Sequence, residues 1–384
     1  MFRKELKKTV TSITYILFVA LLLFFVYTQI GTSFEKVEPP KPDDKSFGVK
    51  YEENPEIIMP SAVASLSDEF TDNSYIAYPI GFYKNVKLNE KKQKKMAAIL
   101  SELKGQLSSE NRLSYSRFQE LMKEADKLIG GGSKYSTTYL KDFGTVPATY
   151  EDAIREYNSI VEKDRMTGAL ARLFSDYIGI VLSIFPVFVA VAIGLRDRRA
   201  NMQGLIFTRR VSSIRFIFCR YIAMVAAMFL PVLALALYAT IQTASEYASF
   251  DINLLAFFTY SIGWLLPTLM VSTAVGVFLT ELTDSPIAIV VQGLWWLIGI
   301  NIGIKHIKGG YGADLAIRHN TVGNTDLYLE HFNILLMNRF GYTLFALTLV
   351  MATIWIYEQK RRGKLDVRSS FEKIFNHRKV KFKA

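Results

Sequence analysis

The sequence predicts an all-α membrane protein with six transmembrane helices and a mainly helical extracellular domain between the first two helices. Half of the 384 residues are hydrophobic, and they are clustered into runs long enough to cross a bilayer. Charged connections separate these runs, as expected for spans joined by solvated loops. The six predicted spans are Val10–Gly31, Leu173–Leu195, Ile217–Ile241, Asn253–Leu279, Pro286–Ile304 and Arg339–Tyr357.

The chain begins with a short basic segment, residues 1–9, that precedes the first apolar run. This charge order is also typical of a signal peptide. The run over residues 10–31 is longer than the apolar part of a signal peptide, however, and no small-x-small cleavage site follows it. We therefore expect a cytoplasmic amphipathic helix followed by an uncleaved transmembrane helix.

Residues 32–172 form the predicted extracellular domain. The proline-rich stretch 32–60 reads as an extended tether, and residues 61–170 are expected to be mainly helical, with a β signal at Tyr75–Phe82. Helical spacing of apolar residues predicts helices over Leu88–Leu103 and Ser114–Ile129, the second ending at Gly130. A third helix, Thr149–Met166, is expected to continue directly into the second span.

The net charge of +11 is unevenly distributed. The predicted extracellular domain is close to neutral, whereas basic residues gather at Arg3–Lys8, at Arg196–Arg215 and in the tail 358–384. All three segments fall on one side if six spans are threaded, which is the positive-inside pattern. This predicts cytoplasmic termini, contact with anionic membrane lipids and no nucleic-acid partner. The one cysteine, Cys219, allows no internal disulfide, which favours a bacterial plasma membrane protein.

Residues 305–338 form a second predicted extracellular loop, whose amphipathic stretch LYLEHFNILLM is too short to span a membrane and either lies at the interface or dips into the membrane before the last helix. On the other side, Glu281–Ser285 is predicted to be a tight cytoplasmic turn.

Motifs of catalysis are absent from the sequence. There is no phosphate-binding loop, no H-E-x-x-H pattern, no G-x-S-x-G pattern and no paired-cysteine spacing. His319 and His331, twelve residues apart in a predicted external loop, are a weak metal candidate. We therefore expect no enzyme activity, no bound cofactor and no metal in this chain.

Polar residues within the predicted spans are few. Asp176 and Arg220 lie near span ends and are expected at the membrane interfaces, since burying them is costly. Gln292 and Asn301 either bond between helices or contact a transported solute. Three prolines interrupt spans and either shape a gate or are simply tolerated kinks. They are Pro186, Pro231 and Pro267.

Three features resemble the permease subunits of ABC-2 type transporters. The start FRKELKKTVTS is similar to the elbow helix of that family, and RDRRANMQGLIFTRRVSSIRFIFCR resembles its coupling segment. The large insert after the first span is similar to the sodium-efflux-like (NatB-like) branch. Val211 or Ser212 stands where the family pattern has a proline.

The resemblance implies a permease that exports a hydrophobic or amphiphilic solute as a dimer, either with a second copy or with a homologue. Its energy would come from a separate ATP-binding cassette ATPase, which binds the ATP. The loop 196–216 would dock on that ATPase, although its arginines could instead only bind lipid. The implied docking residues are Asp197, Arg198, Arg199, Gly204, Leu205, Arg209, Arg210, Ser212 and Arg215.

Two other functions remain open. The chain could be a membrane-anchored sensor or assembly protein whose extracellular helices bind a ligand or partner, although six spans and a short tail fit a sensor less well. A four-span permease with one large external domain fits less well than six visible runs.

Overall fold

The computed structural model describes residues 1–30, 36–79, 83–107, 113–208, 210–303 and 313–365. The described chain is mostly helical with little sheet. It forms two compact units, which are described separately: a membrane unit, Met1–Val37 with Asn158–Ala384, and an inserted unit, Glu38–Tyr157.

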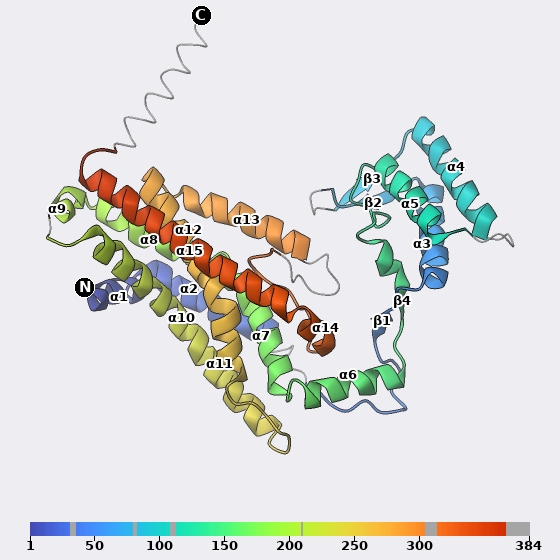
Figure 1. The fold of residues 1–384 in the computed structure, drawn as a ribbon, viewed down its shortest axis with the longest axis horizontal. Helices are drawn as coiled ribbons and strands as arrows, with labels where there is room; N and C mark the ends of the chain where they lie inside the picture. The colour runs from blue at the N-terminus through green and yellow to red at the C-terminus, as the bar shows by residue number, and fades with distance from the viewer. Residues whose placement is uncertain (31–35, 80–82, 108–112, 209, 304–312, 366–384) are drawn as a thin grey trace, which may run out of the picture. The chain divides into compact units, whose positions relative to one another are not determined.

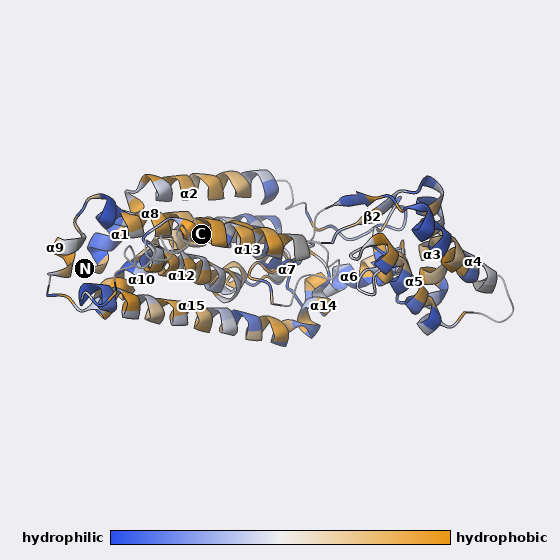
Figure 2. Ribbon diagram, turned by 90° about the horizontal axis from the view of Figure 1, so that it is seen from above, coloured by the Kyte–Doolittle hydropathy of each residue, from blue (hydrophilic) through white to orange (hydrophobic). Residues whose placement is uncertain are grey.

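Four helical segments of the membrane unit are long and apolar enough to cross a membrane: Thr167–Arg199, Ser213–Glu246, Ala256–Thr283 and Phe332–Arg361. They correspond to four of the six predicted runs, although the fourth run begins three residues before its helix. The first run lies in a pair of helices bent by 63°, which counts as a fifth span if the pair is taken as one. The predicted fifth run is a shorter apolar helix over Ile287–Ile300. Figure 2 shows the apolar residues concentrated along these helices.

The membrane unit begins with α1 (Phe2–Val10), and α2 (Ile13–Phe25) follows after a break at which Ser12 caps the second helix. Helix α12 (Leu266–Thr283) is the centre of the unit, with α8 (Pro186–Arg199) and α15 (Phe332–Arg361) packed against it (Figure 1). The remaining elements are η1 (Val26–Ile30), α7 (Thr167–Leu182), α9 (Gln203–Phe207), α10 (Ser213–Glu246), α11 (Ala256–Tyr260), η3 (Ser261–Leu265), α13 (Ile287–Gly303) and α14 (Thr325–Glu330).

The three prolines have different structural consequences. Pro186 occupies the first turn of α8, after a break at Ser183–Phe185 that separates this helix from α7. Pro267 lies in the first turn of α12, directly after the π-helix η3. Pro231 lies inside α10, which remains helical on both sides of it. Only Pro186 therefore coincides with an interruption of helical structure within a span.

The inserted unit packs three helices, α3 (Pro55–Asp72), α4 (Glu90–Leu107) and α5 (Tyr115–Ile129), around one apolar core with η2 (Leu140–Gly144). Two antiparallel strand pairs complete it. They are β1 (Val49–Tyr51) with β4 (Thr145–Pro147), and β2 (Tyr75–Ala77) with β3 (Lys84–Val86).

The helices predicted around residues 88–103 and 114–129 are confirmed as α4 and α5. Ser114 caps the amide of Arg117 at the start of α5, and Gly130 ends this helix in the left-handed conformation at φ 119°. The β signal is confirmed where strand β2 covers Tyr75–Ala77.

Two local predictions are wrong. The stretch predicted as an extended tether already contains β1 and the start of α3. The third helix, α6 (Tyr150–Glu162), ends before the span begins. Arg165 and Met166 adopt φ values of 49° and 60°, which a continuous right-handed helix cannot accommodate.

Candidate functional site

The arginine-rich segment, residues 196–216, folds as the end of α8, the short helix α9 and the start of α10. A turn at Asn201, with φ 51°, separates α8 from α9. Ser212 accepts a hydrogen bond from the amide of Arg215 at 3.2 Å and so caps α10. The serine of the family-like pattern therefore has a structural role in starting this helix.

Helix α9 presents apolar side chains on its outer side. Leu205 is 61% exposed and Met202 is 44% exposed, and Gly204 between them is also exposed. Isolated exposed apolar residues need no explanation. Here, however, they occupy the tip of a connection between two candidate spans, surrounded by basic residues.

The inner side of α9 is fixed to α15. The Phe207 ring meets the Tyr357 ring edge to face at 5.4 Å, and Tyr357 also stacks on Phe216 at 5.1 Å. Arg361 donates hydrogen bonds to the carbonyl oxygens of Phe207 and Val211, at 3.1 and 2.7 Å. The helix is thus held at a defined position although it is only five residues long.

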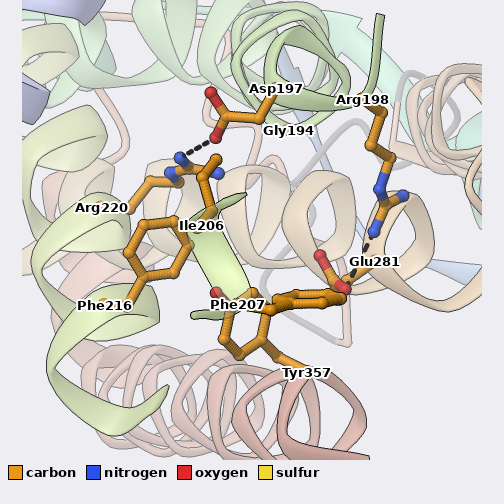
Figure 3. A pocket seen from close by; sticks show the side chains of 9 residues that line it. All are labelled: Gly194, Asp197, Arg198, Ile206, Phe207, Phe216, Arg220, Glu281 and Tyr357. Atoms are coloured by element: carbon orange, nitrogen blue, oxygen red, sulfur yellow. Dashed lines mark hydrogen bonds and ion pairs between the residues drawn. The ribbon is translucent and has the colours of Figure 1, made fainter. Parts of the chain in front are cut away.

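Asp197 and Arg198 point inward, not toward a docking surface. Asp197 pairs with Arg220 at 2.5 Å (Figure 3). Arg220 also reaches Glu5 of α1 at 3.1 Å. The Arg220 guanidinium lies over the Phe216 ring, 4.4 Å from its centre. These contacts join the first helix of the chain to the start of the arginine-rich segment.

Arg198 extends this network to the end of α12. It pairs with Glu281 at 2.9 Å and with Asp284, and it donates to the carbonyl oxygen of Thr280 at 2.7 Å. Lys360 of α15 binds Asp284 from the other side at 2.8 Å. We call this set the ionic cluster; it consists of Glu5, Asp197, Arg198, Arg220, Glu281, Asp284 and Lys360.

The cluster consists of two groups of ion pairs that meet at the adjacent residues Asp197 and Arg198 of α8. One group joins α8 to α1 and α10, and the other joins α8 to the end of α12 and to α15. A cavity of about 20 Å³ between the two groups, lined by Asp197, Arg198, Arg220 and Glu281, has room for about one water molecule.

The remaining basic residues of the segment point outward. Arg196, Arg199, Arg210 and Arg215 are exposed, and none of them forms an ion pair within the described part of the chain. Arg209 lies outside the described residues. The predicted docking residues therefore fall into three groups. Asp197 and Arg198 point inward, and Ser212 caps a helix. The exposed group is Arg199, Gly204, Leu205, Arg210 and Arg215.

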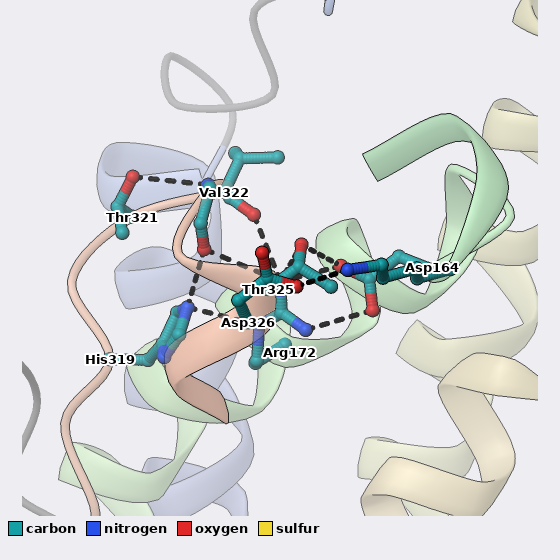
Figure 4. Close-up of polar contacts among 9 residues, drawn as sticks. Asp164, Arg172, His319, Thr321, Val322, Thr325 and Asp326 are labelled. Carbon is teal, nitrogen blue, oxygen red and sulfur yellow. Dashed lines mark hydrogen bonds and ion pairs between the residues drawn. The ribbon is translucent and has the colours of Figure 1, made fainter. Parts of the chain in front are cut away.

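A second polar cluster surrounds the fully buried Arg172 of α7 (Figure 4). Its guanidinium binds both carboxylate oxygens of Asp164, at 2.9 and 2.7 Å, and the carbonyl oxygen of Val322 at 3.1 Å. Thr325 donates to the same carboxylate at 2.6 Å. Arg172 thereby holds the loop before α14 against the start of α7.

His319 completes this cluster. Its Nε2 lies 3.0 Å from Arg172 Nε and 2.8 Å from the carbonyl oxygen of Gly323. Arginine can only donate and a carbonyl oxygen can only accept, so the two contacts make opposite demands on Nε2, which can satisfy one of them at a time. Burial, together with the positive charge of Arg172, lowers the pKa of His319 to about 3. The imidazole is therefore neutral at ordinary pH.

Asp176 and Arg220, expected at membrane interfaces, are both buried within the protein. Asp176 binds Arg318 and accepts hydrogen bonds from the amides of His319 and Asn320, at 2.7 and 2.5 Å. Each charge is thus neutralised by partners elsewhere in the sequence. The cost of burying an unpaired charge was the reason to expect an interfacial position, and pairing reduces that cost.

Sequence reasoning missed three buried basic residues: Arg172, Arg339 and Lys360. Arg339 donates to the carbonyl oxygens of Trp264 and Asp314, at 3.1 and 3.0 Å. All three lie at the edges of apolar runs, where a long basic side chain is expected to extend its charged group into water. Their burial depends on acceptors on other elements, for which the local sequence carries no signal.

Gln292 and Pro186 act at one place. The Gln292 side-chain amide donates to the carbonyl oxygen of Ser183 at 2.5 Å, and the Trp296 indole donates to that of Ile180 at 3.1 Å. The Ser183 carbonyl lies in the break before α8 and the Ile180 carbonyl in the last turn of α7; the amides four residues further on bond elsewhere, that of Ile184 to Val181 and that of Val187 to Ile184. Gln292 therefore bonds between helices, one of the two roles predicted for it. The side chain of Asn301 lies outside the described residues.

Among the described residues, no group of three or more His, Cys, Asp or Glu side chains is placed to hold a metal ion. Comparison with known proteins returned no matching family model, no similar curated protein and no similar solved structure.

Proposed function

We propose that this chain is the membrane-spanning permease subunit of an ABC-2 type transporter, with six spans and both termini in the cytoplasm. In this proposal a separate ATP-binding cassette ATPase binds the ATP and docks on helix α9. The observation that carries the proposal is the arrangement of α9: an exposed apolar tip, Leu205 and Met202, on a helix fixed by Arg361 and Tyr357.

An apolar tip ringed by cations suits a groove with an apolar floor and acidic rim. Burial of the tip in that groove would supply most of the affinity. The charges of Arg199, Arg210 and Arg215 would orient the two proteins and speed their association. Lipid binding alone requires the cations but no fixed short helix, so the rigid attachment of α9 favours a protein partner.

The ionic cluster supplies a route for motion. A displacement of α9 acts on α8 and α10, which flank it, and Arg198 and Arg220 connect these helices to α12 and α1. Since oppositely charged buried groups resist separation, these helix ends would move as one body. The proposed cargo is a hydrophobic or amphiphilic solute, exported by a dimer of two such permease chains in a bacterial plasma membrane.

The test is co-purification from native membranes. A tagged Leu205→Asp variant should lose the ATPase that accompanies the unaltered protein, because a charge at the tip cannot enter an apolar groove. Lys4→Glu in α1, an exposed basic position on the same proposed side, is the matched control and should retain the ATPase. An ATPase that remains bound to Leu205→Asp contradicts docking through α9, and the absence of any ATPase from the unaltered protein contradicts the transporter assignment.

A further inference from the structure

The inserted unit carries a strongly basic face that its near-neutral total charge conceals. Strand β3, the turn after it and the first two turns of α4 contain one acidic residue, Glu90, and six lysines, all exposed. We call this surface the lysine face; it consists of Lys84, Lys87, Lys91, Lys92, Lys94 and Lys95.

The lysine face is not balanced by carboxylates. Elsewhere in the unit, Lys50, Arg117 and Lys134 each lie within 3.1 Å of a carboxylate oxygen. Within the described residues, no lysine of the face forms such a pair. Lys92 donates to the carbonyl oxygen of Leu128 at 2.7 Å, which leaves its charge uncompensated.

The position of these charges on α4 is unfavourable for the isolated unit. Gln93 and Met96 turn inward, so Lys91, Lys94 and Lys95 share the outer face of the helix at spacings of three and four residues. Like charges at that spacing repel, and cations near a helix N-terminus oppose the helix dipole. An anionic partner would relieve both effects.

The chemistry of the face indicates a diffuse anionic surface. It contains only lysines, which act as point charges, and none of the arginines that recognise a single phosphate or carboxylate bidentately. The connection between this unit and the candidate spans is also short. Only residues 158–166 separate it from α7, a length of about 30 Å at most.

We propose that the lysine face binds the anionic phospholipid headgroups of the membrane in which the chain is embedded. Short tethers make this contact intramolecular, so weak electrostatic attraction is sufficient. The interaction does not depend on the transporter assignment, only on membrane embedding. In this proposal the inserted unit has a docked state, in which the lysine face contacts the headgroups, and the population of that state depends on anionic lipid.

The experiment uses the full-length chain in nanodiscs of neutral phosphatidylcholine or of a phosphatidylcholine–phosphatidylglycerol mixture. Cys219→Ser removes the native thiol, and Ala98→Cys, on the outer face of α4 beside the lysines, carries a fluorescent donor. The acceptor is a labelled lipid. Energy transfer should be high with phosphatidylglycerol, low without it, and lost in about 0.5 M salt, where screening shortens to a few ångströms.

The triple variant Lys91→Gln, Lys94→Gln and Lys95→Gln should reduce the ratio of docked to free unit on the order of a hundredfold. The matched control neutralises three exposed lysines outside the face, Lys41, Lys45 and Lys141, and should keep most of the signal. Circular dichroism and thermal unfolding check that both triple variants are folded.

Three results would overturn the proposal. They are equal energy transfer in the two lipid compositions, equal loss in both triple variants, and a change in energy transfer with soluble polyphosphate but not with phosphatidylglycerol. The last result would assign the face to a soluble polyanion.

Discussion

The burial of His319 makes the stability of the protein depend on pH in a calculable way. In the unfolded chain a histidine has a pKa near 6.5, whereas in the folded protein burial beside Arg172 lowers the pKa of His319 to about 3. Between these values the unfolded chain binds a proton that the folded protein does not. The contribution is therefore complete above about pH 6.5 and is lost progressively as the pH falls toward 3.

The magnitude follows from the size of this shift. Each pKa unit corresponds to about 1.4 kcal/mol, so lowering the pH to about 5 should cost about 2 kcal/mol of unfolding free energy through His319 alone. The assay is urea unfolding in detergent at about pH 7.5 and about pH 5. His319→Gln is the reference, because glutamine can accept a hydrogen bond from Arg172 but does not titrate.

The difference between the two proteins isolates His319, since the carboxylates contribute equally to both. The unaltered protein should lose about 2 kcal/mol more than His319→Gln over this pH interval. The same pH dependence in both proteins would refute the reasoning, because it would mean that the imidazole takes up a proton as readily when folded as when unfolded.

Three further predictions concern packing and the ionic cluster, each measured as the free energy of unfolding. Arg220→Met should cost about 3–5 kcal/mol because it leaves the Asp197 carboxylate without this partner and the buried Glu5 with Lys8 alone, and most of this loss should be recovered when Glu5→Leu and Asp197→Leu are added; no recovery contradicts the pairing. Gln292→Leu should cost about 1–3 kcal/mol by leaving a carbonyl oxygen unpaired, and an unchanged stability would place the side chain elsewhere. Gly276→Ala should cost about 1–3 kcal/mol because its Cβ would lie 2.6 Å from a neighbouring side-chain carbon, and a neutral effect would contradict this close approach.

Features with local causes could be predicted from the sequence. The spacing of Met96, Leu100 and Leu103 determines the buried face of α4, and all three are buried. Ser114 and Gly130 delimit α5 through contacts with residues a few positions away. The apolar runs also predicted the helices that are long and apolar enough to cross a membrane, because length and hydropathy can be read from the local sequence.

Features that depend on distant partners could not be predicted in this way. Arg198 and Arg199 are adjacent in a basic stretch, yet Arg198 is engaged by Glu281 and Asp284, some eighty residues away, while Arg199 remains exposed. The local sequence cannot distinguish the two arginines, because only the packing of α8 on α12 places Arg198 against acidic residues. The same holds for Arg172, whose burial depends on Asp164 and on the loop around Val322.

The central claim, that α9 docks on an ATPase, is tested most directly by site-specific photocrosslinking in native membranes. A photoreactive amino acid at Leu205 should form a crosslink to a soluble protein whose sequence contains a phosphate-binding loop of the form G-x-x-x-x-G-K-[ST]. The same amino acid at Leu230, which is 65% exposed within the candidate span α10, should crosslink to lipid only. Crosslinks to lipid alone from both positions would contradict the account.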